Sequence, residues 1–534
     1  MHTDTLKRAS IVLTLLLAVS GCASTSTNTD DLDGRYLDSL SINALPASDN
    51  PSQREFPTHD LLALEQVEQE LQLMLDELLS HWPGTIALPI NVKVSAESLY
   101  MGKAGDDTIL LSLGLIREAR SNDELAFVLS HEAAHILMQH YANNGQFFKN
   151  QDQQMAFVSE LAVFALQLED VGLDNEQALS ESAEKSTRRT LRSQQALAHA
   201  NQNLFSSSLS RQQEDQADLI AIDLMSAAGY SPKAFQPVMH KLSLAYKENE
   251  ARRQARQQQQ QGFIEAMGAN AADDNEFTEI AKLMAIDVGA RILNGSAATH
   301  YPPEQRSAKL QRYIDKAYPA AAPIGSRNVV WQNPLSPFSL EAVGRYQLTQ
   351  QSLLAEQREL AASTLALAQF QGESDNWYPN LVSAQFYQQQ GESARAAASL
   401  AKITHWQGCS IQSYILASQL LRQQNQFDQA YALLKQAQTD IGNATPFYPE
   451  LIVIHRERGD DVAMQQALDD CQQQLQDKAN DCFLAAGLQA TAAGGATPQP
   501  VANESSEDGL ASGLESFENS VEEVGNKLKD LFSF

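Results

Sequence analysis

The sequence predicts a mainly α-helical protein, in which a helical domain with a small β-sheet precedes an α-solenoid. Three observations support this fold class. An apolar helical segment with paired histidines lies in the first third, and a helical segment with paired carboxylates follows it. A 34-residue period then marks the last third, where a repeat domain is expected at residues 340–490. Such a period is typical of stacked helical hairpins.

The composition is that of an acidic, folded protein. Its 534 residues include 66 acidic and 38 basic side chains, so the formal net charge is −28. Phosphate repels a chain this negative, and we therefore expect no nucleic acid as a partner. Hydrophobic residues make up 43% of the chain, which is ordinary for globular proteins.

Residues 1–21 have the form of an export signal. Two basic residues precede the apolar run Ile11 to Val19, which is much shorter than the ~20 residues of a membrane-spanning helix. The sequence Val-Ser-Gly-Cys that ends at Cys22 resembles a bacterial lipobox, which implies a lipidated cysteine. Ala23 then implies sorting to the outer membrane. Residues 22–60 have the polar composition of a flexible tether.

A helix around residues 122–138 is expected to bind a metal. No Gly or Pro interrupts it, and Asn122 or Asp123 is expected to cap its start. His131 and His135 are four residues apart and share one face of the helix. Glu132 completes the pattern His-Glu-x-x-His, which is typical of zinc sites with a glutamate as general base.

The third metal ligand has several candidates. Met138 and Tyr141 occupy the positions where a metzincin needs Gly and His, which excludes that class. His140 is one residue away from the required position and is interpreted as a helix-end histidine. Glu160 has the spacing of a thermolysin-like ligand but lacks the neighbouring residues of that motif. Glu214 is the better candidate, because it begins a second helical segment.

Asp218 lies four residues after Glu214, on the same helical face. It is expected to hold a ligand histidine through the ring nitrogen that does not bind the metal. The alternative is a solvated acidic face.

These motifs together resemble one family of gluzincin metallopeptidases. Ser210 to Asp218 reads Ser-Arg-x-x-Glu-x-x-Ala-Asp, and Ala228 to Pro232 reads Ala-Gly-Tyr-x-Pro. Gly114-Leu115-Ile116 and Thr299 to Arg306 match further segments of the family, so the resemblance covers about residues 80–315. The family includes the CAAX prenyl proteases and the periplasmic β-barrel assembly-enhancing protease.

The resemblance implies a zincin-type fold and a zinc endopeptidase activity. Arg306 and His300 are then exposed-loop candidates for stabilising the oxyanion, and His300 could instead be a fourth zinc ligand in a latent state. The alternatives are a surface ion pair for Arg306 and an ordinary loop histidine for His300. The family's edge-strand signature is replaced near residues 98–100, and the stretch 172–200 is interpreted as an inserted lid or arm.

The last third resembles tetratricopeptide repeats. Gly391, Asn425 and Gly459 are 34 residues apart, and Leu400, Leu434 and Leu468 follow each of them by nine. A helical hairpin cannot bury its apolar face alone, so at least three should stack. The concave face of such a stack binds extended peptides or partner helices.

The remaining segments extend this domain scheme. The peptidase domain is expected at 61–325, a linker at 491–512 and an amphipathic helix at 513–534. Cys471 and Cys482 are the candidate disulfide, because an exported chain meets an oxidising space. The alternative is that these two cysteines and Cys409 are buried thiols.

The sequence therefore predicts a lipid-anchored outer-membrane endopeptidase that faces the periplasm. The resemblance implies stalled or unfolded outer-membrane proteins as substrates, with the assembly machinery docked on the repeats. Two alternatives remain open. One is a chaperone or assembly factor with a latent or structural zinc site, and the other is a processing peptidase for one dedicated substrate.

Overall fold

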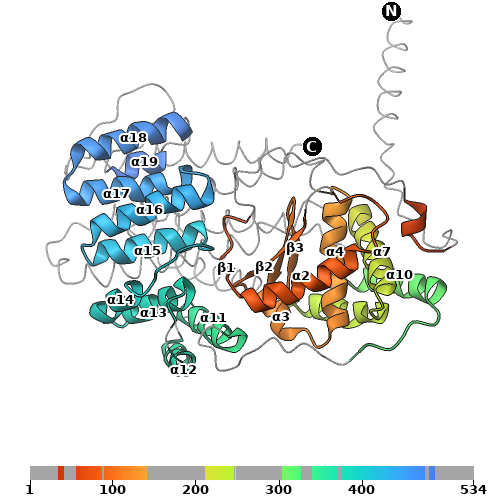
Figure 1. The fold of residues 1–534 in the computed structure, drawn as a ribbon. Helices are drawn as coiled ribbons and strands as arrows, with labels where there is room; N and C mark the ends of the chain where they lie inside the picture. The colour runs from red at the N-terminus through yellow and green to blue at the C-terminus, as the bar shows by residue number, and fades with distance from the viewer. Residues whose placement is uncertain are drawn as a thin grey trace, which may run out of the picture. The chain divides into compact units, whose positions relative to one another are not determined.

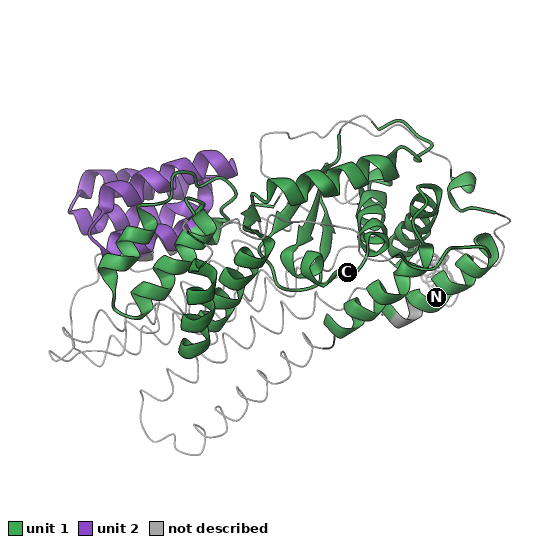
Figure 2. Ribbon diagram, turned by 60° about the horizontal axis from the view of Figure 1, so that its bottom comes forward, with its two compact units in different colours: residues 1–154, 179–413 green, residues 155–178, 414–534 purple. Residues whose placement is uncertain are grey.

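The structure is a computed structural model (Figure 1) that divides into two compact units (Figure 2). Unit 1 comprises residues 1–154 and 179–413, and unit 2 comprises residues 155–178 and 414–534. None of the helices in the described part of the chain is both long and apolar enough to cross a bilayer. The described residues are 34–40, 56–86, 89–140, 211–245, 247, 303–325, 339–354, 357–370, 372, 374–475 and 480–486.

Unit 1 contains a four-stranded mixed sheet with the order β1-β2-β4-β3. Strands β2 and β4 are parallel, and the two outer pairs are antiparallel. The valine, isoleucine and leucine side chains of β2 and β4 are buried, which explains why these residues form the centre of the sheet. The strands are β1 (Leu61–Leu62), β2 (Asn91–Ser95), β3 (Gly102–Ala104) and β4 (Thr108–Ser112).

Five helices pack with this sheet or with one another: α2 (Glu65–Leu79), α3 (Leu113–Glu118), α4 (Asn122–Leu137), α7 (Arg211–Ala227) and α10 (Pro303–Ala317). Helix α2 is amphipathic and buries Leu71, Leu75 and Leu78, which recur at helical spacing. Helix α4 contacts α2, α7 and strand β3, and residues 123–137 are buried along its whole length. This all-round burial is what a helix at the centre of a domain requires.

The start of α4 differs from the expected cap. Ser121, not Asn122 or Asp123, is the N-cap, and its side chain accepts a hydrogen bond from the backbone N–H of Glu124 at 3.2 Å. Asp123 instead accepts hydrogen bonds from the backbone N–H groups of Ser231 and Gly325, at 3.1 and 2.5 Å. Asp123 therefore connects the helix start to two distant segments. Their backbone N–H groups need acceptors, and Asp123 supplies them instead of capping its own helix.

Part of the expected tether packs on helices α7 and α10. Tyr36 and Leu37 are each 5% exposed. The backbone N–H of Leu37 donates to Asp223 at 2.8 Å, and that of Tyr36 donates to the hydroxyl of Tyr313 at 2.7 Å. Apolar burial and these hydrogen bonds hold residues 34–40 in place, so polar composition alone was a poor guide here.

The last third forms helical hairpins. Helices α11 and α12 pack against each other, as do α13 and α14, and α17 with α18. Gly391, Asn425 and Gly459 have φ angles of 76°, 59° and 69°, and each lies in the short connection between two consecutive helices. The helices are α11 (Leu340–Leu354), α12 (Arg358–Gln369), α13 (Trp377–Gln389), α14 (Ser393–Leu400), α15 (Ile411–Gln423), α16 (Phe427–Ile441), α17 (Tyr448–Arg458), α18 (Asp461–Leu475) and α19 (Asn480–Ala485).

The division into compact units keeps the first helices after residue 340 together with the sheet. Helices α11 to α14 belong to unit 1, and unit 2 resumes at Tyr414. The side-chain amide of Gln347 on α11 donates to the carbonyl of Ala96. Asp60 accepts hydrogen bonds from the backbone N–H of Ser410 and the hydroxyl of Ser413, both at 2.8 Å. These polar contacts join α11 and residues 410–413 to the segments that flank strands β1 and β2.

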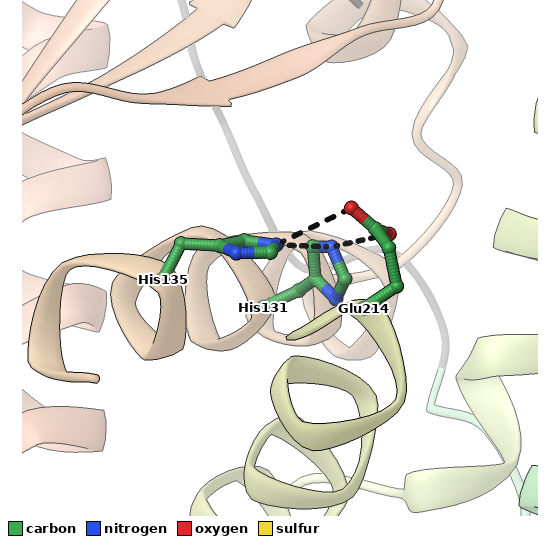
Figure 3. Close-up of side chains that lie close together, drawn as sticks. All are labelled: His131, His135 and Glu214. Carbon is green, nitrogen blue, oxygen red and sulfur yellow. Dashed lines mark hydrogen bonds and ion pairs between the residues drawn. The ribbon is translucent and has the colours of Figure 1, made fainter. Parts of the chain in front are cut away.

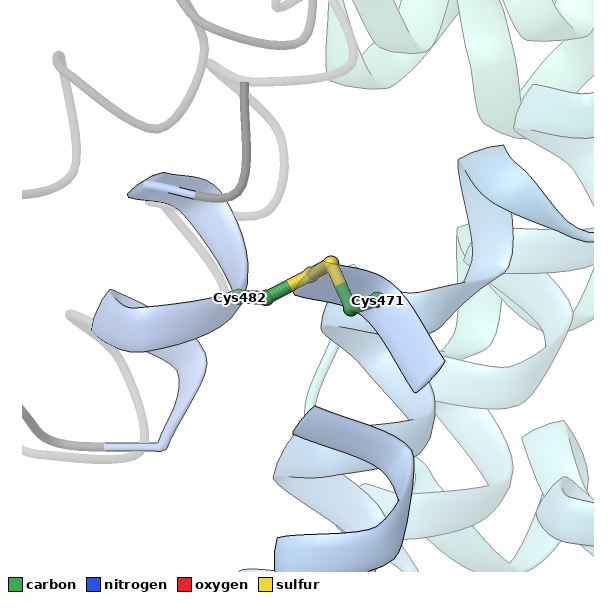
Figure 4. Close-up of a disulfide and its surroundings, with 2 residues drawn as sticks. All are labelled: Cys471 and Cys482. Atoms are coloured by element: carbon green, nitrogen blue, oxygen red, sulfur yellow. A yellow bond between two sulfur atoms is a disulfide. The ribbon is translucent and has the colours of Figure 1, made fainter. Parts of the chain in front are cut away.

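Unit 2 contains a disulfide between Cys471 of α18 and Cys482 of α19 (Figure 4). Their Cα atoms are 6.5 Å apart, within the range that a disulfide can bridge. This is the pairing expected from the sequence, and Cys409 is buried in unit 1.

Several expected features lie outside the described residues. They are the signal peptide 1–21 with the lipidation site Cys22, the lid at 172–200, the loop with His300, the linker 491–512 and the amphipathic helix 513–534.

Candidate metal centre

Helix α4 supplies three of the expected site residues. His131, Glu132 and His135 are 9%, 8% and 1% exposed, because α4 packs against β3 and α7. The two histidines are one helical turn apart, and their Nε2 atoms are 3.1 Å from each other. The i, i+4 spacing therefore brings both imidazoles to one point, as expected from the His-Glu-x-x-His pattern.

Helix α7 brings Glu214 to the same point (Figure 3). Its Oε2 lies 3.7 Å from Nε2 of His131, and its Oε1 lies 3.8 Å from Nε2 of His135. One donor atom from each of the three residues lies within 4.8 Å of the others. Within the described residues, this is the group whose donor atoms could hold a metal ion.

The donor set fits a divalent cation that binds nitrogen and oxygen. Two nitrogen ligands of a tetrahedral zinc ion lie about 3.4 Å apart, from Zn–N distances of about 2.0–2.1 Å. The observed 3.1 Å separation of the two Nε2 atoms is close to this value. Two imidazoles with a carboxylate are also a known donor set of catalytic zinc sites. The residues present therefore suit such an ion.

Asp218 and Arg306 form a charged layer behind these donors. Oδ1 of Asp218 lies 3.0 Å from Nδ1 of His131. Nε and Nη2 of Arg306 donate to the two oxygens of Asp218 at 2.9 and 2.7 Å, and Nη1 lies 3.1 Å from Oε2 of Glu214. The guanidinium thus bridges the carboxylate that holds a histidine and the carboxylate among the metal donors.

Burial and these charges act on the pKa values in opposite directions. Burial alone would raise the pKa of Asp218, but the charges and hydrogen bonds of Arg306 and His131 together lower it. Burial would lower the pKa of His131, but the hydrogen bond and charge of Asp218 raise it above its ordinary value. Burial and the nearby His131 together lower the pKa of His135. The two histidines therefore differ because only His131 faces a carboxylate through its Nδ1.

The position of Arg306 differs from the exposed loop expected for it. The residue lies on α10 and is 6% exposed. Its three guanidinium nitrogens face Asp218 and Glu214, because two buried carboxylates on α7 need a compensating cation. In this arrangement Arg306 offsets part of the negative charge of Asp218 and Glu214. His300 and Glu160 lie outside the described residues.

The edge strand near Glu132 is β3, at residues 102–104 and not at 98–100. Strand β3 contacts α4, and a Cβ atom at Gly102 would lie 2.9 Å from Oε1 of Glu132. The absence of a side chain at Gly102 lets the strand approach this carboxylate closely. The irregular residues 98–100 lead into the strand, and their sequence did not reveal where the edge begins.

His140 is a site residue that the sequence did not reveal. It is 4% exposed, and its Nδ1 lies 2.9 Å from Nδ1 of His135. Its Nε2 lies 3.2 Å from Oε1 of Gln216 on α7. Burial lowers the pKa of His140 to about 4. The left-handed φ of 54° at Gln139 turns His140 back towards the helix, and no sequence signal marks a glutamine for that conformation.

The arrangement defines a class of protein. A buried His-Glu-x-x-His helix, a glutamate from a following helix and an adjacent edge strand are the features of a gluzincin-type metallopeptidase domain. A search of protein families agrees, because residues 84–314 match the profile of Peptidase family M48. This match supports a metallopeptidase of that family. No curated protein matches the chain significantly.

Proposed function

We propose that the protein is a zinc-dependent endopeptidase. The observation that carries the proposal is the convergence of His131, His135 and Glu214, with Glu132 between the two histidines in sequence and against the edge strand. The match of residues 84–314 to a metallopeptidase family supports it. The donor set and the adjacent carboxylate are those of hydrolytic zinc sites.

Each residue of the site has a role in this proposal. Zinc held by the three donors would supply Lewis-acid chemistry to a scissile carbonyl and to an attacking water. Glu132 acts as the general base and returns the proton to the leaving amine. Asp218 fixes the orientation of His131, and Arg306 offsets the charge of two buried carboxylates.

Strand β3 offers a place for an extended substrate. Among the described residues its one neighbouring strand is β4, so its other edge can pair with a peptide backbone. Gly102 places that edge beside Glu132. A peptide bound there would run past the proposed general base, which suits cleavage within a chain.

We further propose that the protein works in the periplasm, anchored to the outer membrane through lipidated Cys22. The disulfide between Cys471 and Cys482 suits an oxidising compartment. The resemblance of the motifs to the family with the periplasmic β-barrel assembly-enhancing protease suggests unfolded or stalled outer-membrane proteins as substrates. The helical hairpins, interpreted as tetratricopeptide repeats, would bind these clients or the assembly machinery.

The test is digestion of an unfolded model polypeptide and an unfolded β-barrel protein by the lipid-free protein. Wild type is compared with Glu132→Gln and His300→Ala, and bound zinc is measured in each preparation. We expect wild type or His300→Ala to cleave, and Glu132→Gln to bind zinc without cleaving. Faster cleavage by His300→Ala would identify its loop as a gate.

Two results would contradict the proposal. Cleavage by Glu132→Gln at the wild-type rate would exclude Glu132 as the base. Zinc bound in all three proteins, with no cleavage of either substrate, would favour a chaperone or assembly factor whose zinc site is latent or structural.

A further inference from the structure

The two histidines of the candidate metal centre have different partners behind them. His131 faces the carboxylate of Asp218, whereas His135 faces the ring of His140. The Nδ1 atoms of His135 and His140 are 2.9 Å apart, and both rings are buried. This pair lies on the side of His135 that is turned away from its metal-facing Nε2.

The distances allow one consistent assignment of protons when His135 binds a metal. Its Nε2 must then offer a lone pair, so its Nδ1 carries the hydrogen. That N–H donates to Nδ1 of His140, which must be an acceptor. Nε2 of His140 therefore carries the second hydrogen and donates to Oε1 of Gln216 at 3.2 Å. The relay needs a neutral His140 and ends on an amide oxygen.

The backbone around His140 fixes the relay in place. The φ angle of Gln139 is 54°, and the backbone N–H of His140 donates to the carbonyl of His135 at 3.0 Å. The carbonyl of His140 accepts a hydrogen bond from the side chain of Gln213 at 3.0 Å. Gln213 and Gln216 of α7 therefore hold His140, which follows the end of α4, and α7 also carries Glu214.

We propose that His140 is a positioning residue for the metal ligand His135, acting with Gln216 to select its tautomer and ring orientation. This inference rests on the proposed metal site. A carboxylate partner makes a ligand histidine more basic, and a neutral imidazole does so less. In this site the charged Asp218 orients His131, whereas the neutral pair His140 and Gln216 orients His135. The contact between His140 and Gln216 also connects the end of α4 to α7.

The test compares two replacements of His140 in the full-length lipid-free protein. His140→Phe keeps a ring but removes the acceptor, whereas His140→Asn keeps an acceptor near the position of Nδ1. Zinc affinity is measured by chelator competition, and the absorption spectrum of the Co²⁺-substituted protein reports the ligand geometry. His240→Phe, at an exposed histidine, is the matched control.

We expect His140→Phe to bind zinc about 10- to 100-fold more weakly, the usual effect of removing such a partner. Its Co²⁺ spectrum should change, while His140→Asn should recover most of the affinity and the spectrum. Gln216→Leu removes the acceptor at the end of the relay but keeps both histidines, and it should weaken zinc binding by a smaller factor. This variant keeps the test decisive if His140→Phe does not fold.

Two results would overturn the inference. One is wild-type zinc affinity and an unchanged Co²⁺ spectrum in both His140→Phe and Gln216→Leu. The other is equal loss in folded His140→Phe and His140→Asn, which would show that the acceptor is not what matters. Failure of the proposed function would look different, because the wild-type protein itself would then bind no zinc or cleave nothing.

Discussion

At the scale of single residues, Gly102 controls how closely the edge strand approaches Glu132. A methyl group at Gly102 would lie 2.9 Å from Oε1 of Glu132 and 3.0 Å from Cγ1 of Val128. The glutamate side chain can move away, so we expect Gly102→Ala to fold and bind zinc normally. Its kcat should fall about 10- to 100-fold, because small displacements of a catalytic group cost that much.

Steady-state cleavage, zinc content and thermal melting of Gly102→Ala would be measured together. Gly325→Ala is the matched control, because its nearest contact is Asp123 at the far end of α4. An unchanged kcat in Gly102→Ala would show that the carboxylate of Glu132 does not need its present position.

The sequence was sufficient to predict those site residues whose positions depend only on spacing within one helix. His131, Glu132 and His135 share a few residues of one helix, and the structure places the histidines and Glu214 together. Arg306 was expected on an exposed loop. Its burial could not be predicted, because it depends on two carboxylates about ninety residues away in sequence. The contact of His140 with His135 depends on the unusual backbone of Gln139, which a glutamine does not signal.

At the scale of elements, the turns of the helical hairpins follow the 34-residue period. Asn425 has φ 59° where the equivalent turns have Gly391 and Gly459. We expect Asn425→Ala to lower the free energy of unfolding by about 1 kcal/mol, since an alanine is strained in the left-handed region. Asn425→Gly should be nearly neutral, because glycine adopts this conformation readily. Urea unfolding followed by circular dichroism measures both.

Gln424→Ala and Gln424→Gly are the matched controls, at the neighbouring residue with no positive φ. If the alanine and glycine variants of Asn425 differ no more than those of Gln424, the turn does not set the stability of its hairpin.

The extent of each unit could not be predicted from element patterns alone. Periodicity located helices 340–490, and the structure has helical hairpins there. Gln347 joins α11 to the residue after β2, and Asp60 joins the residue before β1 to the start of α15, in each case across hundreds of residues of sequence. Composition likewise suggested a tether at residues 22–60, although Tyr36 and Leu37 have specific partners.

At the scale of the whole molecule, the proposed location depends on lipidation at Cys22. We expect wild-type protein expressed in a Gram-negative host to incorporate labelled palmitate and to fractionate with outer membranes. Cys22→Ser should incorporate no label, because the lipid is attached through the thiol, whereas Ser24→Ala should behave like wild type. Labelling of Cys22→Ser at the wild-type level would contradict this anchor.

The central claim is that one metal ion is held by His131, His135 and Glu214. The most direct measurement is the zinc content and zinc affinity of purified wild type, Glu214→Ala and Glu160→Ala. We predict one tightly bound zinc per chain in wild type and in Glu160→Ala, and a loss of tight binding in Glu214→Ala. Tight zinc binding in Glu214→Ala, with its loss in Glu160→Ala, would contradict the site described here.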